Sequence, residues 1–368
     1  MKIAIMAPLV TAIREPQLGG SQAFVSDLAR GLSGRGHEVH VHAASGSEIA
    51  GVTVIDTGVD PQTLAATLYR ASGPPGATSA SALRAAEAAF ARAYASMRDA
   101  RYDVIHNHAF DAPAILLATA QPAPVLHTLH LPPDEVVTAA LLHAVRSGRP
   151  PAIATVSAFQ ARAWGRVVPV DVILRPGVPT GVIPWSQATG NGAVFAGRLS
   201  PEKGAAEAID IAAAAGLSID VYGDAYDLEY ATAQICPRAA RPGVTVHPAV
   251  PRASLWAAMA RAAVVLFPAM WDEPFGMVAA EAQACGTPVV AFRRGGLGEV
   301  IADGVTGFLA PPADLQGFAE AVGKTADIVR AACRGHAERQ LDLDQSLSAH
   351  EGLYQRICSA GAGEAADG

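Results

Sequence analysis

Residues 264–290 read VVLFPAMWDEPFGMVAAEAQACGTPVV, and they predict a strand, a loop, a helix and a second strand in succession. The apolar run Ala263–Phe267 has the length and composition of a buried parallel strand. The loop after it carries Glu273, and a helix begins near Gly276 and ends at Gly286, before the next apolar run. This order of elements is the repeating unit of a doubly wound α/β sheet.

The same alternation extends through most of the chain. The predicted strands are Lys2–Ala7, Glu38–Ala43, Val52–Ile55, Val104–His106, Val125–Thr128, Ile153–Val156, Ala193–Ala196, Ser218–Tyr222, Val244–His247, Ala263–Phe267 and a strand at Val289. The predicted helices are one with Phe24, Leu28 and Leu32 on a single face, Ala80–Ala100, Ala205–Ala215, one around Ser254–Arg261 and the one from Gly276.

The sequence PGVPTGVIPWSQATGNG at residues 176–192 interrupts this pattern, because it is uncharged, rich in Gly and Pro, and has no helical or strand period. We interpret it as an interdomain linker. We expect an α/β protein of two Rossmann-like, doubly wound domains facing a cleft. The predicted domains are residues 1–180 and 181–358, with the last helix able to pack back on the first domain. Residues 359–368 are expected to form a flexible tail.

Composition excludes several classes of protein. The chain has 368 residues, of which 51% are apolar, and a net charge of -7, which disfavours disorder and nucleic-acid binding. Residues 1–180 carry 14 basic and 13 acidic side chains, and the remainder carry 13 and 21. The four cysteines are widely spaced and Met1–Val10 is too short to span a bilayer, with no basic leader before it. We therefore expect a cytoplasmic protein with no integral membrane segment.

The helix that begins near Gly276 has the features of an anion site. Its first N–H groups, on Gly276, Met277 and Val278, have no partner inside the helix and point out of its N-terminus. Glu273 lies before this end and Glu281 about one turn inside it, as hydroxyl groups on either side of a diphosphate would require. The alternative, two solvated glutamates at an exposed helix start, fits the flanking apolar strands poorly.

Two cations lie on another loop between a predicted strand and helix. Arg198 and Lys203 would occupy the carboxyl edge of the second sheet, where ligands bind in open α/β folds. A guanidinium, an ammonium and a helix N-terminus could stabilise a diphosphate leaving group without a metal. The one Asp-x-Asp sequence, Asp342-Leu343-Asp344, follows no strand, so we predict no essential metal and no cofactor.

These motifs together resemble a known family, the retaining, nucleotide-sugar-dependent glycosyltransferases of family 4, with the two-domain GT-B fold. The resemblance covers nearly the whole chain. It rests on the frame E-P-F-G-x-x-x-x-E from Glu273 to Glu281, on G-R-L-S-P-E-K-G from Gly197 to Gly204, on R-P-G-V from Arg175 to Val178 where the family usually has P-N-G-V, on Gly19-Gly20, on Gly295-Gly296 with Glu299, and on Gly304–Leu309 followed by Asp314.

The resemblance implies a role for each part of the second domain. Glu281 would bind the ribose, and Arg198 and Lys203 the diphosphate. Glu273 would bind the sugar hydroxyls, together with the backbone of the helix start. The residues implied in that start are Phe275, Gly276, Met277 and Val278.

The first domain would supply the remaining contacts. Gly19 and Gly20 would let the backbone approach the β-phosphate, and their position 12 residues past the first strand argues against a nicotinamide or flavin site. By the family pattern, His130, rather than His127, lines the donor sugar. His108 would lie on the acceptor side.

The predicted activity is transfer of a hexose from a nucleoside diphosphate to a hydroxyl group, with retention at the anomeric carbon. Front-face attack and a covalent intermediate on Glu273 both remain open. UDP-glucose, UDP-N-acetylglucosamine and GDP-mannose all fit as donors. The near-neutral first domain favours a small soluble sugar or natural-product acceptor over a lipid or cell-envelope acceptor.

Two other classes of protein remain as alternatives. One is a sugar-nucleotide-binding protein without catalysis, although neither the cationic loop nor the glutamate pair is damaged. The other is an oxidoreductase, which the missing dinucleotide fingerprint disfavours. The acceptor loops, residues 57–80 and 131–150, contain no motif that identifies the acceptor, and the oligomeric state is left open.

Overall fold

The computed structural model describes residues 1–61, 80–148 and 150–364, which form two compact units. The described part of the first unit comes from Met1–Arg14, Ser21–Arg175 and the residues from Leu343 onward. The second unit contains Glu15–Gly20 and Pro176–Asp342. Both units are therefore discontinuous in sequence, whereas the sequence analysis drew one boundary at residue 180.

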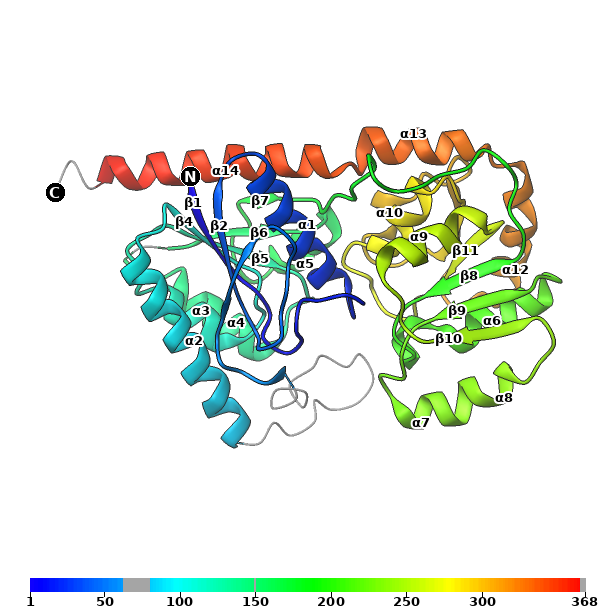
Figure 1. The fold of residues 1–368 in the computed structure, drawn as a ribbon, viewed down its shortest axis with the longest axis horizontal. Coiled ribbons are helices and arrows are strands. Elements are labelled where there is room, and N and C mark those ends of the chain that lie inside the picture. Colours follow the sequence, from blue (N-terminus) through cyan, green and yellow to red (C-terminus); the bar gives the residue numbers. More distant parts are fainter. Residues whose placement is uncertain (62–79, 149, 365–368) are drawn as a thin grey trace. The chain divides into compact units, whose positions relative to one another are not determined.

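The first unit is built on a parallel sheet of seven strands in the order β3-β2-β1-β4-β5-β6-β7. Ile3 of β1 pairs with Val39 of β2 on one side and with Val104 of β4 on the other, so the strand order reverses at β1. Helices pack on the sheet (Figure 1). The strands are β1 (Lys2–Met6), β2 (Glu38–Ala43), β3 (Thr53–Asp56), β4 (Val104–Asn107), β5 (Val125–Leu129), β6 (Ala152–Thr155) and β7 (Val172–Ile173), and the helices are α1 (Gly20–Gly34), α2 (Ala80–Ala100), α3 (Ala112–Ala118), α4 (Glu135–Ala144), α5 (Ala158–Trp164) and α14 (Leu343–Glu364).

The second unit repeats this plan with a parallel sheet in the order β10-β9-β8-β11-β12-β13. Its strands are β8 (Ala193–Ala196), β9 (Ile219–Tyr222), β10 (Val244–His247), β11 (Val264–Phe267), β12 (Val289–Phe292) and β13 (Gly307–Ala310). Its helices are η2 (Pro201–Lys203), α6 (Ala205–Ala214), α7 (Leu228–Tyr230), η3 (Ala231–Ile235), α8 (Cys236–Ala239), α9 (Arg252–Arg261), α10 (Met277–Ala284), α11 (Leu297–Val300), α12 (Leu315–Lys324), η4 (Thr325–Asp327) and α13 (Arg330–Gln340).

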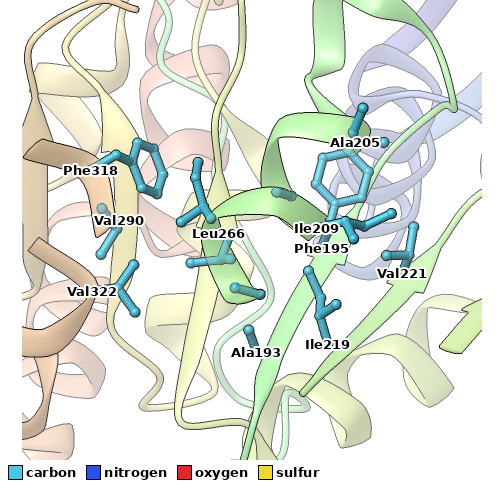
Figure 2. Packing of buried hydrophobic residues seen from close by; sticks show 14 of the residues in the cluster. Ala193, Phe195, Ala205, Ile209, Ile219, Val221, Leu266, Val290, Phe318 and Val322 are labelled. Carbon is cyan, nitrogen blue, oxygen red and sulfur yellow. The ribbon is translucent and has the colours of Figure 1, made fainter. Parts of the chain in front are cut away.

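Apolar side chains from the central strands and two flanking helices form the core of the second unit (Figure 2). Phe195 and Leu266 project from neighbouring strands toward Ile209 of α6 and Phe318 of α12, and all four are 2% exposed or less. The rings of Phe292 and Phe318 meet edge to face, with centroids 5.0 Å apart. The strands β8, β11 and β12 are apolar and buried along their whole length, as expected for parallel strands that helices cover on both faces.

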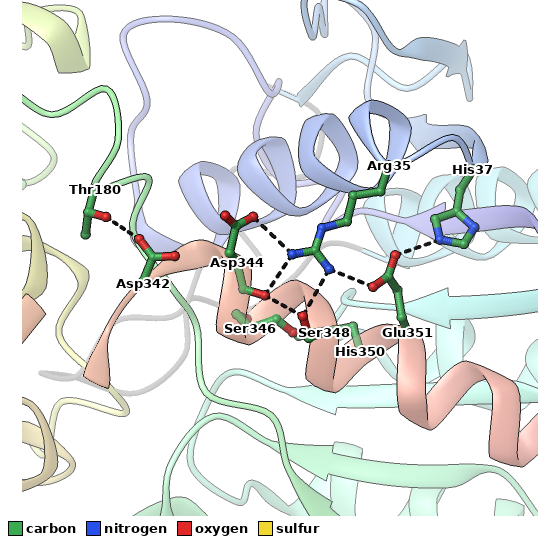
Figure 3. Close-up of polar contacts among 9 residues, drawn as sticks. All are labelled: Arg35, His37, Thr180, Asp342, Asp344, Ser346, Ser348, His350 and Glu351. Carbon is green, nitrogen blue, oxygen red and sulfur yellow. Dashed lines mark hydrogen bonds and ion pairs between the residues drawn. The ribbon is translucent and has the colours of Figure 1, made fainter. Parts of the chain in front are cut away.

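Helix α14 packs against α1 within the first unit (Figure 3). A Cβ on Gly31 of α1 would lie only 2.5 Å from a methyl group of Leu347, so this contact requires a residue with no side chain. At the next turns, the Arg35 guanidinium donates to Glu351 at 2.7 Å and to Asp344 at 3.0 Å. The C-terminal helix thus belongs to the first unit although its sequence follows the second.

The parallel α/β class and the two Rossmann-like units confirm the predicted fold class, and the predicted strands are present to within a residue or two at their ends. The interpretation of residues 131–150 as a loop was wrong, because Glu135–Ala144 forms α4, with Asp134 capping its N-terminus through two N–H groups. Most of the other expected acceptor loop, residues 57–80, lies outside the described residues. Within the expected flexible tail, residues 359–364 belong to α14 and residues 365–368 are not described.

The contact between Leu347 and Gly31 makes a testable prediction. Leu347 is 2% exposed, so Leu347→Ala would leave a cavity between α14 and α1 and lower the free energy of unfolding of the first unit by about 2–5 kcal/mol. Leu228→Ala is the control, because Leu228 is 75% exposed and its loss should change stability by about 0.5 kcal/mol or less. Urea unfolding followed by circular dichroism measures both, and equal midpoints would contradict the assigned packing.

Candidate active site

The segment that begins helix α10 holds the first part of the site. Gly276 adopts the left-handed backbone conformation, with φ 104°, and a Cβ there would lie 2.6 Å from a methyl group of Leu297. No side chain caps α10, and in the part of the chain that the structure describes the N–H groups of Gly276, Met277 and Val278 donate no hydrogen bond. These three donors therefore have no protein partner among the described residues, and the anion site expected at this helix N-terminus stays a prediction.

Glu273 lies in the loop before this helix and is held by two donors from different places in the sequence. Lys203 Nζ donates to Glu273 Oε2 at 2.8 Å, and Trp271 Nε1 donates to the same oxygen at 2.7 Å. The Lys203 ammonium also lies 4.8 Å from the centroid of the Trp271 ring, within range of a cation–π interaction. Both donors use Oε2, so Oε1 has no partner among the described residues.

Two glycines place these groups by close backbone contact. A Cβ on Gly204, which follows Lys203, would lie 2.1 Å from the carbonyl oxygen of Pro268. A Cβ on Gly295 would lie at the same distance from the carbonyl oxygen of Glu273, and the next N–H, on Gly296, donates to that carbonyl at 2.7 Å. The glycines of these motifs therefore bring the Lys203 and Glu273 loops together at the carboxyl edge of the sheet.

Arg198 lies on the same loop as Lys203 but has different partners. Its Nη2 donates to Glu202 at 3.2 Å, and its guanidinium carbon lies 4.3 Å from the centroid of the Tyr226 ring. The structure thus brings Lys203 and Glu273 into direct contact, whereas Arg198 makes no hydrogen bond to either of them.

Glu281 forms a buried ion pair with a residue that the sequence analysis did not identify. Nε and Nη2 of Arg252 both donate to Glu281 Oε1, at 2.9 and 2.7 Å. Glu281 is 4% and Arg252 8% exposed. Trp271 and Arg252 were both missed because nothing in the sequence singles out either contact. The only signal was the position of Trp271, two residues before Glu273.

The structure groups the Gly19-Gly20 loop with the second unit, not with the first domain to which the sequence analysis assigned it. The Arg252 N–H donates to the Glu15 carboxylate at 3.1 Å, which fixes the start of this loop. At its end, a Cβ on Gly20 would lie 3.2 Å from Met277 Cγ, so the loop runs close to the first residue of α10. The segment Glu15–Gly20 belongs to the second unit because of these tertiary contacts, although its place in the sequence is next to the first strand of the first unit.

Within the first unit, a pair of buried histidines lies at the ends of β4 and β5. His108 Nδ1 lies 2.8 Å from His130 Nε2, so one ring donates a hydrogen bond to the other. Burial, with a smaller contribution from His350, lowers the pKa of His130 to about 4. Burial and the neighbouring histidines also hold the pKa of His108 well below its usual range. Both rings are therefore uncharged at neutral pH.

Three further histidines surround this pair. His106 Nδ1 lies 2.7 Å from the Tyr354 hydroxyl, and His106 Nε2 lies 2.7 Å from the Thr128 hydroxyl. His350 of α14 donates from Nδ1 to the Ser346 carbonyl at 2.7 Å. Burial lowers the pKa of His127 and of His350 to about 4. The contacts of His106 join the first unit's sheet to α14. Burial keeps the histidines of this group neutral at neutral pH.

The Asp-x-Asp sequence serves two separate contacts. The Thr180 hydroxyl donates to the Asp342 carboxylate, whereas Asp344 belongs to the Arg35 network of the first unit (Figure 3). Among residues 1–61, 80–148 and 150–364, no three His, Cys, Asp or Glu side chains gather as metal ligands. The absence of an essential metal stays a prediction. No helix within these ranges is both long and apolar enough to cross a bilayer.

Solved structures with the same architecture show which fold this is. Sucrose-phosphate synthase from Thermosynechococcus elongatus superposes with a TM-score of 0.79 at 17% identity, covering 98% of this chain and 100% of the other. Anabaena HepE in complex with UDP and glucose superposes with a TM-score of 0.72 at 21% identity, covering 96% and 99%. Two Rossmann-like units arranged in this topology define the GT-B fold of glycosyltransferases.

Sequence comparison gives the family. The profile described as Glycosyltransferase Family 4 matches residues 18–181, and that described as Glycosyl transferases group 1 matches residues 186–327. A D-inositol 3-phosphate glycosyltransferase of Kribbella flavida is 32% identical, over 84% of this chain and 82% of its own length. A protein of the same name from Xylanimonas cellulosilytica is 30% identical, over 96% of both chains. The chain therefore belongs to glycosyltransferase family 4, as the motifs indicated.

The buried histidines predict a loss of stability in acid. The pKa of His127, of His130 and of His350 is about 4 in the folded protein and about 6.5 in the unfolded chain, so the unfolded state binds more protons between these values. The stabilisation is fully present above pH 6.5 and falls as the pH approaches 4. As the pH falls from 6.5 to 5.5, each of these histidines should lower the free energy of unfolding by about 1 kcal/mol. Urea unfolding at a series of pH values measures this slope.

The variant His130→Gln should reduce that slope, since it removes one group that is neutral only in the folded state. His247→Gln is the control, because His247 is partly exposed beside Asp220 in the second unit and lies outside the buried group. A slope that is unchanged in His130→Gln would contradict the neutral state assigned to His130.

Proposed function

We propose that this glycosyltransferase moves a hexose from a UDP- or GDP-linked donor to a hydroxyl of a small soluble acceptor, with retention at the anomeric carbon and without a metal. The observation that carries the proposal is the contact of Lys203 and Trp271 with one oxygen of Glu273, just before the uncapped N-terminus of α10. A cation, free backbone donors and an available carboxylate oxygen then lie within one short stretch of the fold.

The diphosphate is proposed to bind at the cationic side of this site. Lys203 and the N–H groups of Gly276, Met277 and Val278 would neutralise the charge that develops on the leaving group. Arg198 would add a guanidinium that lies within cation–π range of the Tyr226 ring. Since the donors are fixed before the ligand arrives, little reorganisation is needed in the transition state.

The sugar is proposed to bind at Glu273. Its Oε2 is occupied by Lys203 and Trp271, so Oε1 is the atom that would accept hydrogen bonds from two sugar hydroxyls. The same oxygen is the candidate nucleophile if the reaction has a covalent intermediate, and front-face attack remains the other mechanism. His130 is proposed to contact the donor sugar as a neutral hydrogen-bonding group, and His108 to lie on the acceptor side.

The choice of donor and acceptor is guided by the relatives. HepE was solved with UDP and glucose, which makes UDP-glucose the first donor to test. The relatives from Kribbella flavida and Xylanimonas cellulosilytica are named for an inositol phosphate, a small polar polyol, which supports a small soluble acceptor over a lipid one.

Nucleotide titration tests this proposal directly. We expect UDP or GDP to bind the wild-type protein with micromolar affinity in the presence of a chelator, as measured by calorimetry. Lys203→Met and Arg198→Met should each weaken binding about tenfold or more, since a charge-assisted contact to phosphate is lost. Arg238→Met, which removes a cation paired with Asp210 elsewhere on the same unit, is the matched control. Binding that requires a divalent metal would refute the metal-free site.

Removing the charge of Glu273 should stop the reaction. Glu273→Gln keeps the size of the side chain and one acceptor for Lys203 and Trp271, so the fold should be retained. We expect transfer to fall by a factor on the order of 10² or more, because the carboxylate is needed at the reacting sugar. Glu320→Gln, an exposed substitution on α12, is the control. Turnover by Glu273→Gln at the wild-type rate would exclude the assigned role.

A further inference from the structure

Glu281 and Arg252 form an ion pair that is almost fully buried. A carboxylate as buried as Glu281 is expensive to keep ionised, and an unpaired one would become protonated or destabilise the fold. Arg252 supplies the counter-charge at 2.7 Å. Without this partner, Glu281 would not be a dependable acceptor for a ligand.

The geometry of the pair is one-sided. Nε and Nη2 of Arg252 both point at Glu281 Oε1, although a guanidinium can also bind one carboxylate oxygen with each nitrogen. Oε2 accepts no hydrogen bond from the described residues. One oxygen is therefore saturated by the protein while the other keeps both of its lone pairs.

Arg252 is itself fixed from several directions. It is the first residue of α9, after Pro251, and its backbone N–H donates to Glu15. Its guanidinium carbon lies 4.9 Å from the centroid of the Trp256 ring, one turn further along α9. A side chain held at both ends has little freedom to follow Glu281 if that carboxylate turns, so it determines where the free oxygen points.

We propose that Arg252 is the positioning residue for Glu281, and that the ion pair as a unit presents Oε2 to the vicinal hydroxyls of the donor ribose. This inference rests on the proposed function, in which Glu281 binds the ribose. Arg252 does not touch the nucleotide in this account. It supplies the counter-charge to Glu281 and holds its orientation, so that the two hydroxyls donate to one oxygen that has no competing partner.

The test compares ligands that differ only at the ribose. UDP, its 2′,3′-dideoxy analogue and inorganic pyrophosphate are titrated into wild type and Arg252→Lys, with the guanosine pair used if GDP is the nucleotide that binds. Wild type should prefer UDP over the dideoxy analogue by about tenfold or more. In Arg252→Lys the preference should fall below about threefold, since an ammonium cannot make the paired contact to Oε1. Pyrophosphate affinity should change less than about twofold, because the diphosphate donors are untouched.

Arg238→Lys is the matched control, since Arg238 makes the same kind of Nε and Nη2 contact with Asp210 on the same unit. It should keep the wild-type preference. If Arg252→Lys is unstable, the double variant Arg252→Gln/Glu281→Gln removes both buried charges and should fold, with the ribose preference lost and pyrophosphate binding kept. In steady-state assays, Arg252→Lys should raise KM for the donor with little change in kcat.

Each alternative outcome overturns a different statement. A variant at Arg252 that keeps the wild-type ribose preference refutes the positioning role and leaves the proposed function intact. A wild-type protein that binds UDP and its dideoxy analogue equally refutes the ribose role of the pair. A wild-type protein that binds neither nucleotides nor pyrophosphate refutes the proposed function, and the inference with it.

Discussion

The ion pair between Lys203 and Glu273 is the interaction on which the candidate site depends. It joins two loops that are 70 residues apart in the sequence and lie at the carboxyl ends of β8 and β11. These strands are neighbours where the strand order of the sheet reverses, which is where open α/β sheets bind ligands. The contact requires a close backbone approach, which Gly204 allows beside Pro268. Because the ion pair joins the two loops, the position of the Lys203 ammonium and that of the Glu273 carboxylate depend on each other.

A second physical theme is the treatment of buried polar groups. In the second unit, Glu281 is buried as a charge and therefore has a charged partner, Arg252. In the first unit, the histidines near His130 are buried beside hydroxyl, amide and carbonyl groups and other histidines, and burial lowers their pKa so that they stay neutral. The first arrangement suits a group that must accept hydrogen bonds from a ligand. The second suits groups that bind or orient without adding charge.

Much of the fold followed from local patterns, and the exceptions have identifiable causes. The strands were predictable because parallel strands covered on both faces are short apolar runs. Helix α4 was missed because it is only 10 residues long and follows Pro132-Pro133, a pair typical of loops, although Asp134 is a good N-cap. The sequence analysis allowed for the last helix to pack back on the first domain, but the contacts that hold α14 there, Leu347 against Gly31 and the partners of Arg35, could not be predicted from local patterns.

The sequence by itself determined the α/β class, the family and the main candidate residues, because these depend on short-range order: apolar periods, glycines at fixed offsets, and charges next to strand ends. Tertiary structure alone decided which atoms remain free for a ligand. It selected Trp271 and Lys203 as donors to one oxygen of Glu273, Arg252 as the partner of Glu281, and the second unit as the place of Gly19-Gly20. The physical reason is that hydrogen bonds and ion pairs require distances of about 3 Å between groups far apart in the chain. Only packing of the whole unit brings such groups together.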